Sequence, residues 1–180
     1  PFCAMHPDDA SQLGIAEQDV VTLESRWGLA RARVQITTDQ SPGSVFMPMH
    51  WTGVLASNSR VGAVVNPVVD PVSGQPENKH TPVRVRRFEA KWHGFVLSDI
   101  AIPLPVADYA VAIRGGKFWR FELAGMECPE SRVELANELQ GNMQMALPAT
   151  TETLEYVDAA HGVYRRAHVF EGRLLAVCFL

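Results

Sequence analysis

The sequence has few cysteines, no long apolar run and a chain charge that is not basic. Its three cysteines, Cys3, Cys128 and Cys178, lie far apart and form no CxxC pair, so we expect neither a zinc site nor an iron–sulfur cluster within the chain. An odd number of cysteines fits a reducing compartment better than a disulfide framework, and we expect a cytoplasmic protein. No stretch approaches the ~18 consecutive apolar residues of a membrane-spanning helix, so no membrane partner is expected.

Short catalytic motifs are absent as well. The six histidines show no HxxxH spacing, and the patterns GxSxG, GxGxxG and GxxxxGK[ST] do not occur. A metal held by protein ligands, a serine hydrolase and a glycine-rich phosphate loop are therefore not predicted. Taken alone, the residues predict no complete catalytic machinery, and we assign no catalytic residue.

Composition predicts a folded chain of one large or two small domains. Of 180 residues, 47% are hydrophobic and 20% are charged, which allows a substantial core and argues against disorder. The formal net charge of -4 argues against a nucleic-acid partner, which would require a basic face. Residues 1–88 carry eight basic and eight acidic side chains, whereas residues 89–180 carry eight basic and twelve acidic ones.

The first half is predicted to contain one short helix and several strands. Residues 6–14 have Pro7 in the first turn, two aspartates after it and Gly14 at the end, which is typical of a capped helix. Alternation of small or apolar with polar residues over 30–36 indicates a half-buried strand. Further strands are predicted over residues 20–25, 44–47 and 82–87.

The pattern changes near residues 88–91, where we place a domain boundary. Beyond it, residues 111–123 read as a hairpin whose Gly115-Gly116 turn supplies positive φ, and 129–139 as a helix with Glu130 in its first turn. Strands are predicted over residues 92–97, 153–159, 162–170 and 173–179. The second domain is therefore expected to be a small antiparallel α+β unit.

A loop of about thirty residues, 51–81, is long for a compact domain, and such loops are usually functional or disordered. Its valines are too numerous for a free tail, so it should pack on something. Within it, residues 70–80 read DPVSGQPENKH, a polar run with two prolines, one glycine and one cation, Lys79. Prolines keep the backbone extended, glycine permits close approach, and a lysine can meet phosphate or pterin oxygens. The alternative is an ordinary solvated loop.

Three stretches of the first half carry a family resemblance: residues 5–15, MHPDDASQLGI, residues 45–51, VFMPMHW, and the run 70–80. Together they resemble the last barrel domain of molybdopterin-guanine-dinucleotide oxidoreductases, and within them the assimilatory nitrate reductases. The resemblance implies that the chain is mainly β or α+β. Residues 1–88 would form a double-psi β-barrel, the molybdopterin-dinucleotide-binding domain, lacking its first segment. Residues 89–180 resemble the accessory segment that follows this barrel.

By the same resemblance, the parent enzyme is an oxidoreductase of nitrate assimilation. It would reduce nitrate to nitrite at a molybdenum bis(molybdopterin guanine dinucleotide) centre, Mo-bis-MGD. The [4Fe-4S] cluster and the molybdenum ligand would lie upstream, so this chain alone is expected to be inactive and to hold no metal. Its partners would be the remaining domains of the same polypeptide and a ferredoxin or NAD(P)H-dependent electron donor.

The resemblance implies cofactor-binding roles, with alternatives, for a small set of residues. Lys79 falls on a cofactor-contacting lysine of the family but could be a solvated lysine. His50 could contact the pterin or only hydrogen-bond within the protein, and Trp51 more often anchors packing. Met49 would contribute mainly its backbone, and Gly62 stands where relatives have a cofactor-contacting Asn. Gln75 is also assigned to the cofactor, although Ser73, Gln75 and Asn78 could instead hold the loop's own backbone.

Three arginines, Arg84, Arg86 and Arg87, could form a phosphate patch, but strand alternation would place Arg84 and Arg86 on one solvated face. Two rival functions remain open. One is another molybdopterin oxidoreductase of the formate dehydrogenase kind, which would share the barrel and change the substrate. The other is a double-psi barrel used as a protein-binding module, which would not explain the run 70–80.

Overall fold

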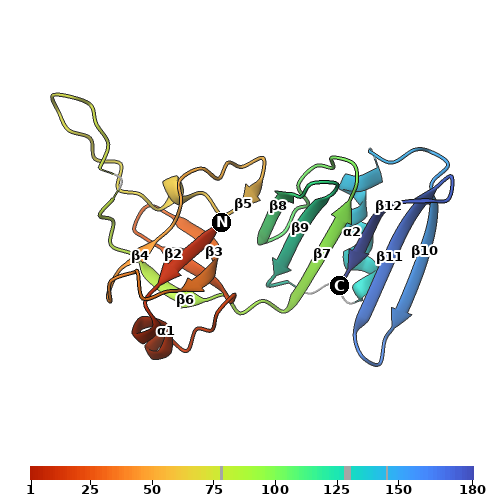
Figure 1. The fold of residues 1–180 in the computed structure, drawn as a ribbon, viewed down its shortest axis with the longest axis horizontal. Helices are drawn as coiled ribbons and strands as arrows, with labels where there is room; N and C mark the ends of the chain where they lie inside the picture. Colours follow the sequence, from red (N-terminus) through yellow and green to blue (C-terminus); the bar gives the residue numbers. More distant parts are fainter. Residues whose placement is uncertain (78, 128–130, 145) are drawn as a thin grey trace. The chain divides into compact units, whose positions relative to one another are not determined.

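The computed structural model describes residues 1–77, 79–127, 131–144 and 146–180. The proposed backbone role of Asn78, and the predictions made for Cys128, Pro129 and Glu130, fall outside these described residues. The chain divides into two units, Pro1–Glu89 and Ala90–Leu180, which are described separately. Both units contain strands, and among the described residues α1 belongs to the first unit and α2 to the second (Figure 1). The expected mainly β, α+β character is confirmed.

The first unit is built on one curled, five-stranded sheet in the order β4-β1-β3-β2-β6, a half-barrel (Figure 1). Strand β1 runs parallel to β3, whereas the other neighbours are antiparallel. This parallel pair joins strands that are not consecutive, so the sheet is not a simple meander. The strands are β1 (Phe2–Met5), β2 (Val20–Glu24), β3 (Leu29–Ile36), β4 (Val45–Phe46) and β6 (Arg84–Arg87).

Helix α1 (Pro7–Leu13) forms where its end signals predicted it. The His6 Nδ1 atom accepts a hydrogen bond from the backbone N–H of Asp8, with the two nitrogens 3.2 Å apart. At the other end Gly14 has φ of 63°, a left-handed conformation that costs glycine little. Its N–H bonds the Ser11 carbonyl oxygen at 3.2 Å, which satisfies an otherwise free end of the helix.

The core of the first unit comes from the alternating residues of β3 and from its neighbours. Ala30, Ala32 and Val34 of β3 are all fully buried, as the predicted half-buried strand requires. Buried side chains from β1, α1 and β2 surround them, and Met47 and Val64 join the same cluster from the segments on either side of the long loop. The loop's valines therefore pack only in part, since Val64 is in this core and Val61 packs against it, whereas Val68 and Val69 are exposed.

The predicted loop 51–81 is not structureless. It contains the short strand β5 (Ala56–Ser57) and the 3₁₀ turn η1 (Val61–Ala63), which sequence alone did not reveal because both are only two or three residues long. Beyond residue 66 the chain leaves the sheet as a narrow projection, visible as the long excursion at the left of Figure 1.

The second unit has an antiparallel sheet in the order β10-β11-β12-β7-β9-β8. Helix α2 (Arg132–Gln144) lies against one side of it, where it contacts β11. The last turn, Glu171-Gly172, has φ of 49° and 75°, as a tight hairpin turn needs. The strands are β7 (Trp92–Ser98), β8 (Tyr109–Arg114), β9 (Trp119–Gly125), β10 (Glu152–Asp158), β11 (Val163–Phe170) and β12 (Arg173–Phe179).

The predicted helix is present, with different bounds, and one turn prediction is wrong. α2 covers Arg132–Gln144 instead of 129–139, and at its start Ser131 and Glu134 exchange side-chain bonds to each other's backbone N–H at 3.1 and 3.2 Å. The predicted positive φ at Gly115-Gly116 is absent, because four residues link β8 to β9 and a loop of that length does not require it. A Cβ at Gly115 would make a tight contact, 3.0 Å from the Phe118 carbonyl oxygen.

Candidate functional site

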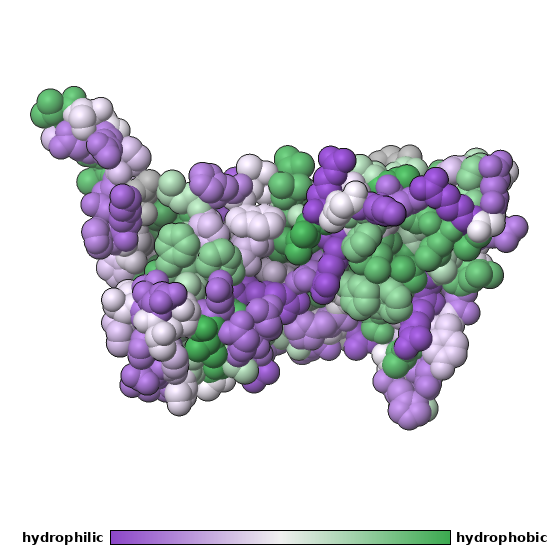
Figure 2. Space-filling model, in the orientation of Figure 1, coloured by the Kyte–Doolittle hydropathy of each residue, from purple (hydrophilic) through white to green (hydrophobic). Residues whose placement is uncertain are grey.

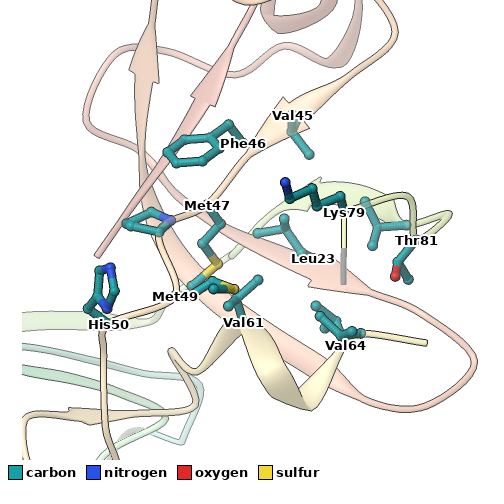
Figure 3. Close-up of a pocket in the computed structure, with 13 residues that line it drawn as sticks. Leu23, Val45, Phe46, Met47, Met49, His50, Val61, Val64, Lys79 and Thr81 are labelled. Carbon is teal, nitrogen blue, oxygen red and sulfur yellow. The ribbon is translucent and has the colours of Figure 1, made fainter. Parts of the chain in front are cut away.

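A pocket of about 500 Å³ opens in the first unit, between the end of β4 and the long loop (Figure 3). Four separate segments meet there: β2, the stretch that follows β4, the η1 turn and the chain leading into β6. The described residues that line it are Leu23, Val45, Phe46, Met47, Pro48, Met49, His50, Val61, Val64, Val65, Lys79, Thr81 and Val83.

The walls of the pocket are mostly apolar and partly rigid. Met47 and Val64 belong to the buried core, so this part of the wall is fixed by the packing of the sheet. Phe46 and Met49 are more than half exposed and lie at the rim. A pocket with apolar walls and few polar groups favours a flat organic ring over a small hydrated ion.

Lys79 supplies the pocket's fixed positive charge. Its side chain extends across the opening, with the ammonium nitrogen directed toward Phe46 (Figure 3). The turn that carries it is organised by Glu77, whose Oε1 accepts from the backbone N–H groups of Lys79 at 3.1 Å and His80 at 3.2 Å. These hydrogen bonds lower the pKa of Glu77, because they stabilise its carboxylate form.

The projection of residues 66–77 is a narrow hairpin that ends in a tight loop. At its base the Asn66 N–H donates to Thr81 Oγ1 at 3.0 Å, and the Glu77 N–H donates to the Val68 carbonyl oxygen at 2.9 Å. At its tip Asp70 Oδ1 accepts from the backbone N–H of Ser73 at 2.7 Å and from its hydroxyl at 2.9 Å. These bonds lower the pKa of Asp70 and give the tip a defined shape.

Three of the six residues assigned to the cofactor line this pocket, namely Met49, His50 and Lys79. The other three do not. Trp51 lies just beyond His50, Gly62 lies within η1 with open space where a Cβ would be, and Gln75 is exposed at the projection. The backbone carbonyl of Gln75 accepts from the Asp70 N–H at 2.8 Å, so it takes part in the hairpin. All six cofactor roles stay predictions.

Sequence reasoning missed most of the pocket's walls. Among these walls, Phe46 and Met47 belong to the motif that carries the resemblance, and the valines of residues 61–65 are part of the apolar composition of the long loop. Leu23 and Val83 gave no signal, since each looked like an ordinary strand residue. Strand pairing brings them to the same place: Leu23 lies on β2 and pairs with Val85 of β6, two residues beyond Val83.

Arg84 and Arg86 lie on the solvated face that strand alternation predicted, since both are exposed and Val85 between them is less so. Arg86 Nη2 lies 2.6 Å from Glu24 Oε2 across the strand pair, and Arg87 Nε lies 3.4 Å from Asp19 Oδ2. Both are therefore engaged with carboxylates of the first unit, and neither lines the pocket. Arg84 is exposed at the start of the strand and is also outside the pocket lining.

Cys3 and Cys178 are buried, and burial raises the pKa of each thiol to about 12. Both therefore act as small apolar core residues, as Cys178 was expected to. In the part of the chain that the structure describes, no three His, Cys, Asp or Glu side chains gather as a metal site would require. No described helix combines the length and the apolar character needed to cross a bilayer.

Comparison with known families gives a match over most of the first unit. Residues 1–82 match the family described as "Molydopterin dinucleotide binding domain". The match ends just before β6 and includes every described pocket residue except Val83. The first unit, with its pocket, is therefore similar to molybdopterin dinucleotide-binding domains.

Curated relatives include nitrate reductases and formate dehydrogenases. A nitrate reductase of Klebsiella oxytoca is 36% identical over 107 residues, 59% of this chain and 12% of that protein. A nitrate reductase of Synechocystis sp. is 42% identical over 62 residues, 34% of this chain and 9% of that protein. An F420-dependent formate dehydrogenase subunit alpha of Methanocaldococcus jannaschii is 37% identical over 88 residues, 49% of this chain and 12% of that protein. The chain thus spans about a tenth of the length of these relatives.

Proposed function

We propose that this chain is the cofactor-binding region of a molybdenum oxidoreductase of the assimilatory nitrate reductase type. The observation that carries the proposal is the pocket of the first unit, in which an apolar wall and Lys79 meet inside the matched domain. The two nitrate reductases, at 36% and 42% identity, support nitrate as the substrate of the parent enzyme. That enzyme would reduce nitrate to nitrite.

The residues present fit one end of a dinucleotide-bearing pterin cofactor. A planar heterocycle would find apolar contacts along Met47 and Val64, and the Lys79 ammonium would meet a phosphate or pterin oxygen through a charge-assisted hydrogen bond. His50, exposed at the rim, adds a second donor. When bound, Mo-bis-MGD supplies the redox chemistry that takes one oxygen from nitrate. The chain's own residues hold and orient the cofactor and shield one side of it from water.

The remaining partners follow from this assignment. The other domains of the parent polypeptide would supply the molybdenum ligand and the iron–sulfur cluster, and a ferredoxin or NAD(P)H-dependent protein would deliver electrons. On this proposal the 180-residue chain purified alone should give no nitrite in a reduced-dye assay. Turnover from the isolated chain would contradict it.

Formate oxidation is the second candidate for the parent enzyme. Two F420-dependent formate dehydrogenase subunits also match this chain, at 37% identity over 88 residues and 31% over 87. Assaying the parent enzyme with nitrate and a reduced dye, and separately with formate and an oxidised dye, distinguishes the two. Nitrate turnover without formate turnover supports our assignment, and the reverse result replaces it.

The cofactor role is tested by Lys79→Ala in the parent enzyme. Losing one charge-assisted hydrogen bond of about 1.5–3 kcal/mol should weaken cofactor binding roughly tenfold to a hundredfold. Molybdenum and guanine dinucleotide content, measured after purification and dialysis, should fall while the fold of the first unit is retained. Arg84→Ala is the matched control, since Arg84 is an exposed cation outside the pocket lining. Full cofactor content in Lys79→Ala would show that the loop is only structural.

A further inference from the structure

The sheet of the second unit has one covered face and one open face. Helix α2 covers the face that carries Arg166, whose Nη2 donates to Asn137 Oδ1 of the helix at 2.7 Å. Residues that pair across strands share a face, so the opposite side can be followed through the register. We call it the outer sheet face. Over β10, β11, β12 and β7 it consists of Leu154, Tyr156, Arg165, Ala167, Val169, Leu174, Val177, Phe179, Phe95 and Leu97, with Glu152 at one end, and it continues on β9 to Glu122 and Arg120.

Over β10, β11, β12 and β7 the outer sheet face is mostly apolar and partly exposed, whereas its β9 side carries the Arg120–Glu122 ion pair. Leu154 is 59% exposed and Tyr156 is 55% exposed, although both are large apolar side chains in a regular strand. Figure 2 shows hydrophobic side chains gathered over the strands of the second unit, on the side opposite α2. A contiguous apolar patch of this kind on a folded domain marks an interaction surface.

Aromatic rings and a guanidinium form a row across this face. Tyr156 of β10 pairs with Arg165 of β11, which pairs with Phe179 of β12, which pairs with Phe95 of β7. The Phe95 and Phe179 rings stack with centroids 4.4 Å apart, and the Arg165 guanidinium lies 5.8 Å from the Tyr156 ring and 5.9 Å from the Phe179 ring. Tyrosine, phenylalanine and arginine in one flat cluster are typical of the centre of a protein interface.

Two opposite charges on this face have no partner in an ion pair of the described residues. Arg165 contacts rings only, and Glu152 is exposed at the start of β10. They sit on opposite sides of the central row that contains Leu154 and Ala167, since Glu152 pairs with Val169 and Arg165 pairs with Tyr156. They are therefore too far apart along the strands to meet within one copy of the sheet.

We infer that the outer sheet face binds a second copy of this chain, face to face, about a two-fold axis. We place the axis between the two sheets, across the strands and along the row of Leu154, Ala167 and Val177. The row that contains Arg165 in one copy would then face the row that contains Val169 and Glu152 in the other. Both Arg165 guanidinium groups would then gain a carboxylate, and both Leu154 side chains would be buried. Sheets that pack in this way lie about 10 Å apart, a gap that an arginine side chain spans.

The charges of the face are self-complementary about this axis, which supports a second copy as its occupant. Four strands of about seven residues make a patch roughly 20 Å by 20 Å, within about a factor of two of the ~800 Å² per partner of a standard interface. Pairing at the free edge of β10 is disfavoured, since its charged residues Glu152, Glu155 and Asp158 are all acidic and would repel those of a second β10. The chain's net charge of -4 disfavours nucleic acid as the occupant.

Sedimentation equilibrium of the 180-residue chain tests the inference, and it does so independently of the cofactor proposal. We expect a concentration-dependent dimer of two 19.9 kDa chains. Leu154→Glu should weaken dimerisation at least tenfold, and Arg165→Glu should do the same. The doubly changed chain, Arg165→Glu with Glu152→Arg, should restore most of the affinity, because the two-fold arrangement exchanges the two charges symmetrically.

Val157→Glu is the matched control, since Val157 is an exposed apolar residue of the same strand that points to the other face. It should leave the dimer intact, and circular dichroism confirms that each variant is folded. The inference is overturned if the wild-type chain is still monomeric at a concentration of about 100 μM. It is also overturned by a dimer that survives both single changes, or by one that Arg165→Glu breaks and the double change fails to restore. If Leu154→Glu does not fold, the Arg165 and Glu152 variants decide the question alone.

Discussion

Arg166 on β11 donates to Glu155 on the neighbouring strand β10, with Nε and Oε1 2.8 Å apart. The arginine is 97% buried, whereas the glutamate lies at the edge of the sheet with its side chain 41% exposed. The Tyr164 hydroxyl donates to the same carboxylate oxygen at 2.7 Å, and these bonds lower the pKa of Glu155. Because Arg166 also bonds Asn137 of α2, this one side chain ties the helix to the sheet and to the edge strand.

Arg166→Ala should therefore destabilise the second unit strongly. It removes three side-chain or backbone partners at once and leaves a cavity under α2, at a cost of about 2–4 kcal/mol. Glu155→Gln keeps a hydrogen-bond acceptor on the exposed side and should cost only about 1 kcal/mol. Hydrogen exchange of the α2 amides measures the loss of stability in both variants, Arg166→Ala and Glu155→Gln. Equal protection of α2 in the wild-type chain and in Arg166→Ala would show that the helix is held by its apolar face alone.

A pH dependence should come from His168, which is buried beside Arg166. Burial, and then the nearby Arg166 charge, lower the pKa of His168, although Glu155 acts in the opposite sense. Its Nδ1 lies 3.3 Å from Thr153 Oγ1, and its Nε2 is buried without a hydrogen-bond partner. In the folded unit His168 is thus held in its neutral form. In the unfolded chain the same side chain takes up a proton below its ordinary pKa of 6.5.

The free energy of unfolding should accordingly fall as the pH drops below 6.5, and level off below the lowered pKa of the folded state. Chemical denaturation of the second unit at several pH values between 7.5 and 5 checks this. His168→Gln, which cannot be protonated, should flatten the profile in this window. An unchanged slope in His168→Gln would assign the effect to other groups.

Substitutions at Gly28 and Gly62 distinguish a packing role from a cofactor-binding role in the first unit. A Cβ at Gly28 would lie 2.5 Å from the carbonyl oxygen of Ala63 in η1, whereas a Cβ at Gly62 meets nothing within 4 Å. Gly28→Ala should therefore cost about 1–3 kcal/mol and disturb the η1 wall of the pocket. Gly62→Ala should leave the stability of the first unit within about 0.5 kcal/mol of wild type.

Thermal denaturation followed by circular dichroism measures both glycine variants. If Gly28→Ala is as stable as wild type, η1 is free to move away from the β2–β3 turn. Loss of cofactor in a normally folded Gly62→Ala parent enzyme would support the contact that the family resemblance assigns to this position.

The elements that the sequence predicted are those whose signals are local. Helix α1 is specified by its own ends, from His6 to Gly14, and the alternation in β3 states which residues are buried. The Glu171-Gly172 turn likewise needs only its own two residues to adopt positive φ. The differences are also local: the Ser131–Glu134 capping pair sets the start of α2, and the Gly115-Gly116 link is longer than a two-residue turn.

The sequence by itself determined which family the first unit resembles, because residues 5–15, 45–51 and 70–80 carry short motifs that can be read without a structure. Only the tertiary structure decided which residues share the pocket. Lys79 and Met49 line it, whereas the backbone carbonyl of Gln75 bonds the Asp70 N–H within the hairpin. Hydrogen bonds to Glu77 and Asp70 set this path of the loop. Leu23 and Val83 join the wall because strand pairing, which acts across sixty residues of sequence, brings β2 and the approach to β6 together.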